Sequence, residues 1–370
     1  MRVLQIINST NINSGIAQVI MNFYRGIDRT EVQFDFLLFG KAKENFDNEI
    51  KEFGGNIYYF TKPGLTSYFD SCKDLDAFFR SKCNYYDIVH CNELLVANLV
   101  FKYAKKYGPP ICISHSHGAW IREKAIKKLR NRLATFNLVK NSDRCFACSQ
   151  SAAEYVFGKG IVKNCKYKFI PNVLDINKYK YCEDLRNMVR TELGVEDKFV
   201  LGNTGRLNLH DKNQLFAVDV LAEILKSNKN AVLVLVGAGP DEEEIRKYVE
   251  KDNLQGRVIL MGLQRDIKGI LSAMDYYIFP SNYEGFGLSL LEAQVNGLPC
   301  ICFDNMPKEV IINKVTRMDV KSKPKDWAYK IASHISGGGC RDAAMSDFNE
   351  FNMEIMANQL LEKYKEALVN

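Results

Sequence analysis

Apolar and polar positions follow two recurring patterns along the chain. Short, continuous apolar runs of strand length alternate with longer segments in which apolar residues return every three or four positions, as at Ile16, Ile20 and Phe23. Such runs are typical of buried parallel strands, and the segments between them predict helices that cover both faces of a sheet. In the first half of the chain the expected strands are Val3–Ile7, Val32–Phe39, Ile57–Phe60, Asp87–His90, Ile111–Ser114, Cys145–Cys148 and Lys168–Ile170.

The alternation loosens over residues 175–184, after Pro171, and then starts again. In the second half the expected strands are Phe199–Gly202, Ala231–Val236, Val258–Met261, Tyr276–Phe279 and Pro299–Cys302. The last segment, residues 351–370, has apolar residues at helical spacing. We therefore expect an α/β protein with two doubly wound, Rossmann-like domains, residues 1–172 and 173–350, followed by a helix.

Composition is that of an ordinary globular protein. The chain has 370 residues, 46% hydrophobic and 25% charged, which is enough for two hydrophobic cores. Its first residues lack the form of a signal peptide, and no stretch approaches the length of a membrane span. Most of the eleven cysteines lie in or beside apolar runs, where a thiol packs as a small hydrophobe. We expect a cytoplasmic protein in a reducing compartment.

Positive charge is concentrated in one segment. The net charge is +6, and between Phe101 and Arg144 basic residues far outnumber the acids Glu123 and Asp143. Within it, residues Ile121–Leu133 have the spacing of a basic amphipathic helix. This helix is either a solvated face or a surface for anionic lipid. No recognition motif accompanies the charge, so we expect no nucleic-acid partner.

The most informative segment runs from Pro280 to Ala293. It follows an apolar run, contains Glu284 and two glycines in a turn, and then begins a helix that carries Glu292. Unpaired N–H groups at a helix start favour an anion. One carboxylate can therefore lie at the anion site while the other binds nearby hydroxyls, which suits a sugar attached to a phosphate.

A second set of polar residues follows another expected strand. Arg206 and Lys212 lie in a short loop and at the start of the next helix. Ligands of open α/β sheets bind beyond the carboxyl ends of the strands. Two cations at this position suit a diphosphate, although two surface cations in a loop have the same spacing.

Two strand ends of the first half carry weaker signals. Ser14-Gly15 precedes a helix, and a glycine there lets the backbone approach a phosphate or sugar. His115 and His117 share one face if their strand continues. No cysteine or carboxylate is spaced to complete a metal site with them, so hydrogen bonding to sugar hydroxyls is favoured. His90 is interpreted as a core or wall residue.

Three other motifs are rejected. Gly237-Ala238-Gly239 lacks the third glycine of a dinucleotide fingerprint, and the acids that follow it would repel phosphate. Asp74 and Asp76 have the Asp-x-Asp form, but on a helix residues i and i+2 do not converge. The single Cys145-x-x-Cys148 has no second pair at zinc spacing. We expect no metal site.

These motifs together resemble a known family. Gly205-Arg206-Leu207 with Lys212-Asn213, Gly237-x-Gly239-Pro240 and the segment Asp275–Ala293 are similar to glycosyltransferase family 4, a group of retaining enzymes with the GT-B fold. The similarity is densest over residues 199–302. The residues after Cys302 resemble the branch found in bacterial capsule and exopolysaccharide gene sets.

The resemblance implies how the domains divide the work. Residues 1–172 would bind the acceptor and residues 173–350 the donor, across a cleft, and the helix 351–370 would pack on the first domain. Arg206 and Lys212 would neutralise the donor diphosphate, and Glu292 would bind the ribose. The remaining implied site residues are Glu284 and His117 as catalytic residues on the donor sugar, with Gly15, Gly285, Phe286, Gly287 and Leu288 as donor-binding residues. Gly118 departs from the family's usual Asp or Asn.

The implied activity is that of a hexosyltransferase. A nucleotide-diphosphate sugar, by family habit a UDP-sugar, would be the donor, and a glycan or polyprenyl-linked molecule the acceptor, without a cofactor or divalent metal. The helix Ile121–Leu133 would then give peripheral contact with an anionic membrane, at the inner face of the cell membrane. Two alternatives are an inverting transferase or epimerase that acts on a sugar nucleotide, and a non-catalytic sugar-nucleotide-binding protein.

Overall fold

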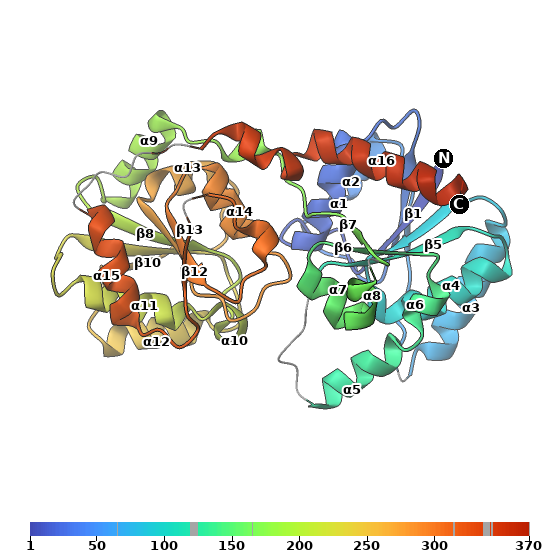
Figure 1. The fold of residues 1–370 in the computed structure, drawn as a ribbon, viewed down its shortest axis with the longest axis horizontal. Coiled ribbons are helices and arrows are strands. Elements are labelled where there is room, and N and C mark those ends of the chain that lie inside the picture. Colours follow the sequence, from blue (N-terminus) through green and yellow to red (C-terminus); the bar gives the residue numbers. More distant parts are fainter. Residues whose placement is uncertain are drawn as a thin grey trace. The chain divides into compact units, whose positions relative to one another are not determined.

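The computed structural model describes residues 1–64, 66–118, 125–164, 166–313, 315–335, 341 and 343–369, with the side chains of 125–128 excepted. The chain divides into two compact units (Figure 1). The first comprises Met1–Leu174 together with Glu350–Asn370, and the second comprises Asp175–Asn349. Each unit is an α/β structure around one parallel sheet, the fold class that the sequence predicted.

Unit 1 contains a seven-stranded sheet of order β3-β2-β1-β4-β5-β6-β7, in which every neighbouring pair is parallel. Its strands are β1 (Arg2–Ile7), β2 (Gln33–Leu38), β3 (Ile57–Tyr59), β4 (Ile88–Cys91), β5 (Ile111–Ser116), β6 (Arg144–Ala147) and β7 (Lys168–Phe169). The chain reverses its direction of travel across the sheet between β1 and β4. Ligands of such sheets bind beyond the strands' carboxyl ends at this point.

Helices surround this sheet. They are α1 (Gly15–Gly26), α2 (Asp47–Glu52), α3 (Tyr68–Ser81), α4 (Leu94–Lys106), α5 (Ala125–Ala134), α6 (Leu138–Asn141), α7 (Gln150–Phe157), α8 (Lys159–Lys163) and α16 (Met353–Val369). Helix α1 begins where the hydroxyl of Ser14 accepts from the backbone of Ala17. It buries Val19, Ile20 and Phe23, the helical period visible in the sequence.

The last helix belongs to unit 1 although it follows unit 2 in the sequence. Leu174 donates a backbone hydrogen bond of 2.9 Å to Phe351, just before α16 begins. Helix α16 packs on α1, and a Cβ at Gly26 would lie 2.7 Å from the carbonyl oxygen of Met353. Helices α1 and α16 can approach this closely because residue 26 is a glycine and has no side chain.

Unit 2 repeats the same plan. Its sheet has the order β10-β9-β8-β11-β12-β13, again all parallel, with β8 and β11 at the reversal. The strands are β8 (Phe199–Thr204), β9 (Ala231–Val236), β10 (Val258–Leu260), β11 (Tyr276–Phe279), β12 (Cys300–Phe303) and β13 (Val315–Met318). The sequence pattern missed β13, because Thr316 and Arg317 interrupt its apolar character at the edge of the sheet.

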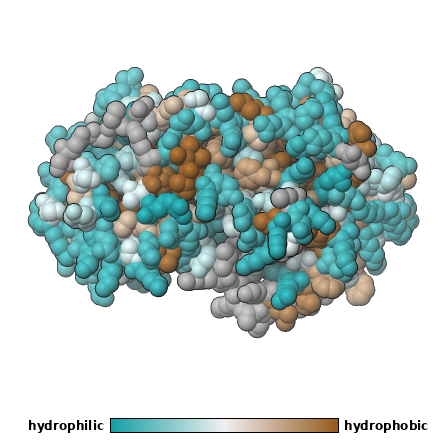
Figure 2. Space-filling model, in the orientation of Figure 1, coloured by the Kyte–Doolittle hydropathy of each residue, from teal (hydrophilic) through white to brown (hydrophobic). Residues whose placement is uncertain are grey.

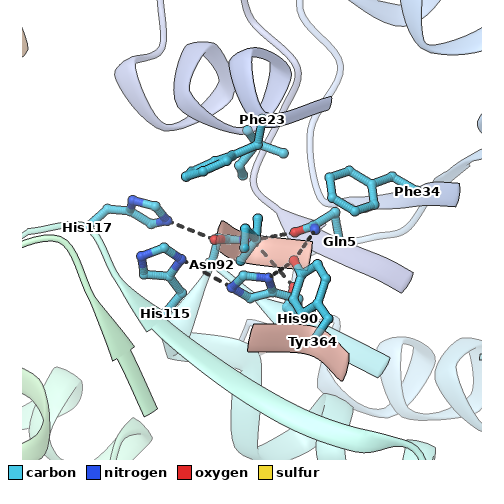
Figure 3. A pocket seen from close by; sticks show the side chains of 10 residues that line it. Gln5, Phe23, Phe34, His90, Asn92, His115, His117 and Tyr364 are labelled. Atoms are coloured by element: carbon cyan, nitrogen blue, oxygen red, sulfur yellow. Dashed lines mark hydrogen bonds between the residues drawn. The ribbon is translucent and has the colours of Figure 1, made fainter. Parts of the chain in front are cut away.

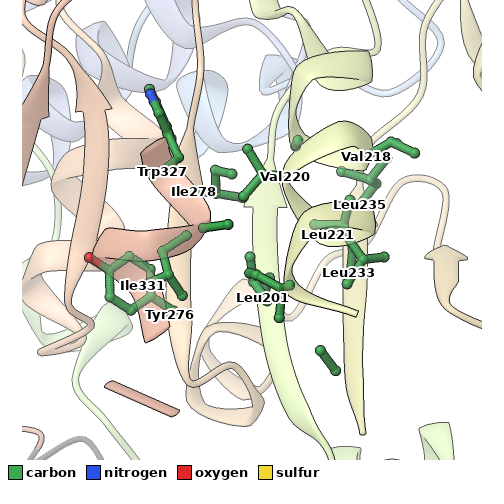
Figure 4. Close-up of a cluster of buried hydrophobic side chains, with 14 of the residues drawn as sticks. Leu201, Val218, Val220, Leu221, Leu233, Leu235, Tyr276, Ile278, Trp327 and Ile331 are labelled. Atoms are coloured by element: carbon green, nitrogen blue, oxygen red, sulfur yellow. The ribbon is translucent and has the colours of Figure 1, made fainter. Parts of the chain in front are cut away.

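Unit 2 has its own set of helices. They are η1 (Ile176–Tyr179), α9 (Glu183–Leu193), α10 (Leu209–Lys212), α11 (Gln214–Ile224), α12 (Glu242–Lys251), α13 (Ile267–Ala273), α14 (Leu288–Val295), η2 (Lys308–Val310) and α15 (Pro324–Ile335). The short helix η3 (Met345–Phe351) begins in unit 2 and ends in unit 1. Helices α11 and α15 cover one face of the sheet, where Leu201, Leu221 and Trp327 meet in the core (Figure 4). Every residue of β9 is buried, as a strand covered on both faces requires.

The rejected motifs have structural partners. Asp76 accepts hydrogen bonds from Arg80, Lys106 and Tyr107, which hold α3 against the end of α4. Cys145 and Cys148 are buried in unit 1. In the part of the chain that the structure describes, no helix has the length and apolar character needed to cross a membrane.

Candidate active site

The predicted donor site of unit 2 lies at the carboxyl ends of β8 and β11. Helix α14 begins at Leu288, directly after Gly287, whose φ is +96°. This left-handed conformation favours glycine, and it ends the turn so that the first N–H groups of α14 have no partners within the helix. Phe286 is buried at 2% exposure and anchors the turn. The glycines on either side of it, Gly285 and Gly287, have no side chains and can offer only backbone groups to a ligand.

Lys212 and Glu284 form an ion pair at this edge of the sheet. The Nζ of Lys212 lies 2.5 Å from the Oε1 of Glu284, and the two side chains are only 23% and 10% exposed. The ammonium also lies 5.7 Å from the ring centre of Phe279. Lys212, the residue predicted to bind phosphate, is thus in direct contact with Glu284, the residue predicted to bind the sugar.

Backbone contacts bring these two residues together. The backbone N–H of Asn282 donates to the carbonyl of Asp211 at 2.8 Å. The side-chain amide of Asn282 donates to the carbonyl of His210 at 3.0 Å. Helix α10, which follows β8, is therefore held against the turn that follows β11. The ion pair results from strand order, since β8 and β11 are neighbours.

Arg206 lies beside this pair in sequence and is exposed. Its backbone carbonyl accepts from the side-chain amide of Gln214 at 2.9 Å, which orders the loop. Among the described residues no hydrogen bond or ion pair involves its guanidinium, so this cation is available to a ligand.

The glycine loop after β9 supports the Arg206 loop. A Cβ at Gly237 would lie 2.0 Å from the carbonyl oxygen of Gly205, and one at Gly239 would lie 2.0 Å from that of Leu207. Only glycines allow this approach. Asp241 then accepts from the backbone of Leu209 at 2.7 Å. The loop thus has a structural role in shaping the candidate site.

Glu292 lies inside α14, and the Tyr179 hydroxyl is its hydrogen-bond partner. Burial raises the pKa of the Glu292 carboxyl to about 7, and the hydrogen bond from Tyr179 partly offsets this. Tyr179 ends η1, the first element of unit 2. Glu284, in the turn, and Glu292, in the helix that follows it, therefore have different hydrogen-bond partners.

The unit 1 candidate His117 follows β5 and lies in a polar network (Figure 3). Its Nε2 is 2.8 Å from the Oδ1 of Asn92, and its Nδ1 is 3.1 Å from the Oδ1 of Asn172. The rings of His115 and His117 are 4.0 Å apart. Burial lowers the pKa of His117 to about 4. The imidazole is neutral at pH 7 and can act as one donor and one acceptor.

Comparison with known proteins identifies the family. The model of glycosyl transferases group 1 matches residues 186–347, and that of Glycosyltransferase Family 4 matches residues 13–178. The chain belongs to glycosyltransferase family 4. It is an enzyme of the hexosyltransferase type that acts on nucleotide sugars, as the sequence motifs predicted.

Curated relatives match this glycosyltransferase over most of its length. The putative glycosyltransferase EpsF of Bacillus subtilis is 26% identical over 342 residues, 91% of this chain and 88% of the relative. The capsular polysaccharide biosynthesis glycosyltransferase CapH of Staphylococcus aureus is 24% identical, with 90% of each chain covered. An Escherichia coli protein is 29% identical over 79% of this chain and 80% of its own length. Its name is UDP-Gal:alpha-D-GlcNAc-diphosphoundecaprenol alpha-1,3-galactosyltransferase.

Solved structures share the GT-B fold. Anabaena HepE in complex with UDP superimposes with a TM-score of 0.82 at 18% identity, covering 99% of this chain and 100% of that one. Its complex with UDP-glucose gives a TM-score of 0.80 at 19% identity, covering 99% and 100%. At such identity the likeness concerns the fold.

The structure places the predicted site residues of this glycosyltransferase in both units. Gly15, the exposed first residue of α1, and His117 lie in unit 1, and the rest lie in unit 2. The residues brought into contact are Lys212 and Glu284. Their assigned roles stay predictions.

Several polar residues of unit 1 escaped the sequence pattern. Asn92 and Glu93 follow β4 as His117 follows β5, and Lys62 pairs with Glu93 at 3.4 Å. Polar residues directly after an apolar run are a usable signal at a sheet edge. Gln5 gave no signal, because it is a polar residue buried inside β1.

Proposed function

We propose that this family 4 member is a retaining glycosyltransferase that transfers a sugar from a UDP-sugar to a glycan or lipid-linked acceptor in surface polysaccharide synthesis. The observation that carries the proposal is the half-buried Lys212–Glu284 pair with the exposed Arg206 at the carboxyl ends of β8 and β11. Such a site offers positive charge to a diphosphate and a carboxylate to sugar hydroxyls.

The leaving group explains the two cations. When the anomeric bond breaks, negative charge develops on the β-phosphate of the nucleotide. That charge would be stabilised by Arg206, Lys212 and the first N–H groups of α14. These groups are already in place before the reaction starts, so they need no rearrangement. We propose that this arrangement takes the part that a divalent metal has in other transferases. Glu292 would bind the ribose hydroxyls.

Relatives support the choice of donor and acceptor. The fold is that of HepE, which has been crystallised with UDP and with UDP-glucose. The E. coli relative is named for a UDP-galactose donor and a diphosphoundecaprenol acceptor. CapH is named for capsular polysaccharide biosynthesis, which favours a role in capsule synthesis.

Retention of configuration needs the leaving group and acceptor on the same face of the sugar. Glu284 is paired with Lys212, so we propose that it positions the sugar and forms no covalent intermediate. His117, neutral at pH 7 because burial lowers its pKa to about 4, would bind a sugar hydroxyl.

The first test is the anomeric configuration of the product. Thermal shifts with UDP-glucose, UDP-galactose and their N-acetyl forms identify the donor, since a bound donor raises the unfolding temperature. With that donor and a lipid-diphosphate sugar acceptor, proton NMR is expected to show the α-linkage of an α-linked donor retained. A β-linked product identifies an inverting enzyme. UDP binding without transfer or hydrolysis identifies a binding protein.

Helix α5 supports a membrane-contact proposal. Leu129, Leu133 and Phe136 are 61%, 67% and 69% exposed. Leu129 and Leu133 are four positions apart and lie on one side of α5, and Phe136 lies in the turn that follows the helix. Arg130 and Arg132 beside them are also exposed, and apolar and hydrophilic residues are mixed at the lower edge of Figure 2. Of the predicted helix Ile121–Leu133, residues 121–124 lie outside the described residues.

We propose that α5 contacts an anionic membrane surface, which would place the enzyme peripherally on the inner face. An apolar stripe with flanking cations is the pattern of an interfacial helix. Each cation near such a surface contributes about 1 kcal/mol at moderate salt.

Vesicle binding tests this surface. The protein is expected to cosediment with vesicles containing phosphatidylglycerol, and binding should fall as salt is raised. Leu129→Ser with Leu133→Ser should weaken binding at least about thirtyfold, since each buried leucine contributes over about 1 kcal/mol and about 1.4 kcal/mol is a factor of ten. Tyr329→Ser, at a still more exposed aromatic position in unit 2 (79%), serves as the control. Equal binding to neutral vesicles contradicts the proposal.

A further inference from the structure

A polar network connects β1, β4, β5 and the C-terminal helix inside unit 1 (Figure 3). Gln5, Asn92 and Tyr364 are 2%, 6% and 0% exposed. They surround, with His90 and others, a cavity of about 10 Å³, which is room for one water molecule at most. These polar groups must therefore satisfy one another, so the direction of each hydrogen bond follows from its neighbours.

Asn92 gives the starting point. Its Nδ2 lies 3.0 Å from the Oε1 of Gln5 and 3.4 Å from the backbone carbonyl oxygen of His90. A carbonyl oxygen only accepts, so this atom of Asn92 is the amide NH₂ group. The other atom, Oδ1, is then the one that lies 2.8 Å from the Nε2 of His117. His117 must carry its proton on Nε2, and when neutral it has its lone pair on Nδ1.

The other side of Gln5 follows in the same way. Since its Oε1 accepts from Asn92, its Nε2 donates to the hydroxyl of Tyr364 at 3.2 Å. That hydroxyl donates in turn to the Nδ1 of His90 at 2.6 Å. The Nε2 of His90 then donates to the Nδ1 of His115 at 3.1 Å. Gln5 thus has two arms, one that ends at His117 and one that ends at His115.

We propose that Asn92, oriented by Gln5, is a positioning residue that keeps the proton of His117 on Nε2 and leaves Nδ1 to accept from a hydroxyl of the donor sugar. This proposal rests on the proposed function. The nearest atom to Nδ1 is the Oδ1 of Asn172 at 3.1 Å. Two acceptors cannot bond each other, so with a lone pair on Nδ1 the Asn172 amide must be turned over and place its NH₂ group there. A sugar hydroxyl is the kind of donor that replaces that group.

The Tyr364 arm offers a matched control. Tyr364→Phe removes two buried hydrogen bonds of the same network, from Gln5 and to His90, yet it leaves Asn92 and His117 in contact. Asn92→Leu removes the contact with His117 itself. Asn92→Asp restores an acceptor for the Nε2 proton, although it loses the donor to Gln5.

Nitrogen NMR of the five histidines reads the tautomer directly, with His117→Gln for assignment. Wild type, Tyr364→Phe and Asn92→Asp are expected to show His117 protonated on Nε2, and Asn92→Leu to lose that preference. With whichever of UDP-glucose and UDP-galactose is the donor, Asn92→Leu should lower kcat/KM about tenfold, the rate equivalent of one lost hydrogen bond. Tyr364→Phe should stay within about threefold of wild type, and UDP, which lacks the sugar, should bind all variants equally.

Two outcomes overturn the proposal. One is a wild-type His117 that carries its proton on Nδ1. The other is an Asn92→Leu variant that transfers sugar as fast as wild type. A failure of the proposed function gives a different result from a failure of this proposal. If the wild type transfers no sugar, the proposed function is wrong, but NMR still reports the tautomer of His117 in each variant.

Discussion

Lys212→Ala or Glu284→Ala abolishes sugar transfer while the chain remains folded. Each change removes one member of the 2.5 Å ion pair and so either the cation on the leaving diphosphate or the carboxylate that positions the sugar. Loss of one group that stabilises developing charge typically lowers the rate about 10²–10³-fold. We expect kcat/KM to fall at least that far, as measured by release of UDP from the donor.

Folding must be checked in parallel, because each variant leaves a partly buried charge without its partner. Such a charge costs roughly 1–3 kcal/mol, so thermal unfolding should occur at a lower temperature but remain cooperative. Arg246→Ala, which breaks the exposed pair with Glu242 on α12, should leave both activity and stability near wild type. Turnover within about threefold of wild type in either site variant contradicts the assignment.

The double variant shows whether the two residues act as a unit. If Lys212 aligns Glu284 as well as binding phosphate, the combined loss in Lys212→Ala with Glu284→Ala is smaller than the sum of the single losses. Additive losses would instead indicate two independent contributions to the transition state.

The stability of unit 1 should fall steeply as the pH drops below about 6.5. Burial lowers the pKa of His90 to about 3 and that of His117 to about 4, and lowers that of His115 well below its usual range. Charge on neighbouring histidines adds to the effect for His90 and His115. In the unfolded chain all three take up protons near pH 6.5.

The sign follows from proton uptake. Below pH 6.5 the unfolded chain binds protons that the folded chain refuses, so the free energy of unfolding decreases as the pH falls toward 4. Each histidine lowers the free energy of unfolding by at most about 1.4 kcal/mol per pH unit, and the three together by at most about 4 kcal/mol per pH unit. Urea unfolding at pH 7.5, 6.0 and 5.0 measures this slope.

Controls locate the effect. In a Trp120→Phe variant the fluorescence of Trp327 follows unit 2, so circular dichroism should detect loss of unit 1 at a higher pH than the fluorescence change. His115→Leu should reduce the slope by about one third, and His210→Gln, with a side chain that is 60% exposed, should leave it unchanged. A constant free energy of unfolding between pH 7.5 and 5.5 shows that the three histidines do not control stability.

The sequence by itself determined the fold class and the family. Strands such as β9, buried along their whole length, need a continuous apolar run, and helices such as α1 need an apolar stripe. Both are local patterns, so they can be read without knowing which elements meet. The Lys212 and Glu284 motifs were recognisable for the same reason, since each lies where an apolar strand ends.

Only the tertiary structure decided which of these residues touch. Lys212 and Glu284 are 72 residues apart, and Gln5 and Tyr364 are 359 apart. Their contacts depend on strand order and on the return of α16 to unit 1, which no local pattern encodes. The edge strand β13 was missed because an edge position tolerates polar residues. The pattern of buried positions can be read from the sequence, but the partners of the buried polar groups depend on tertiary packing.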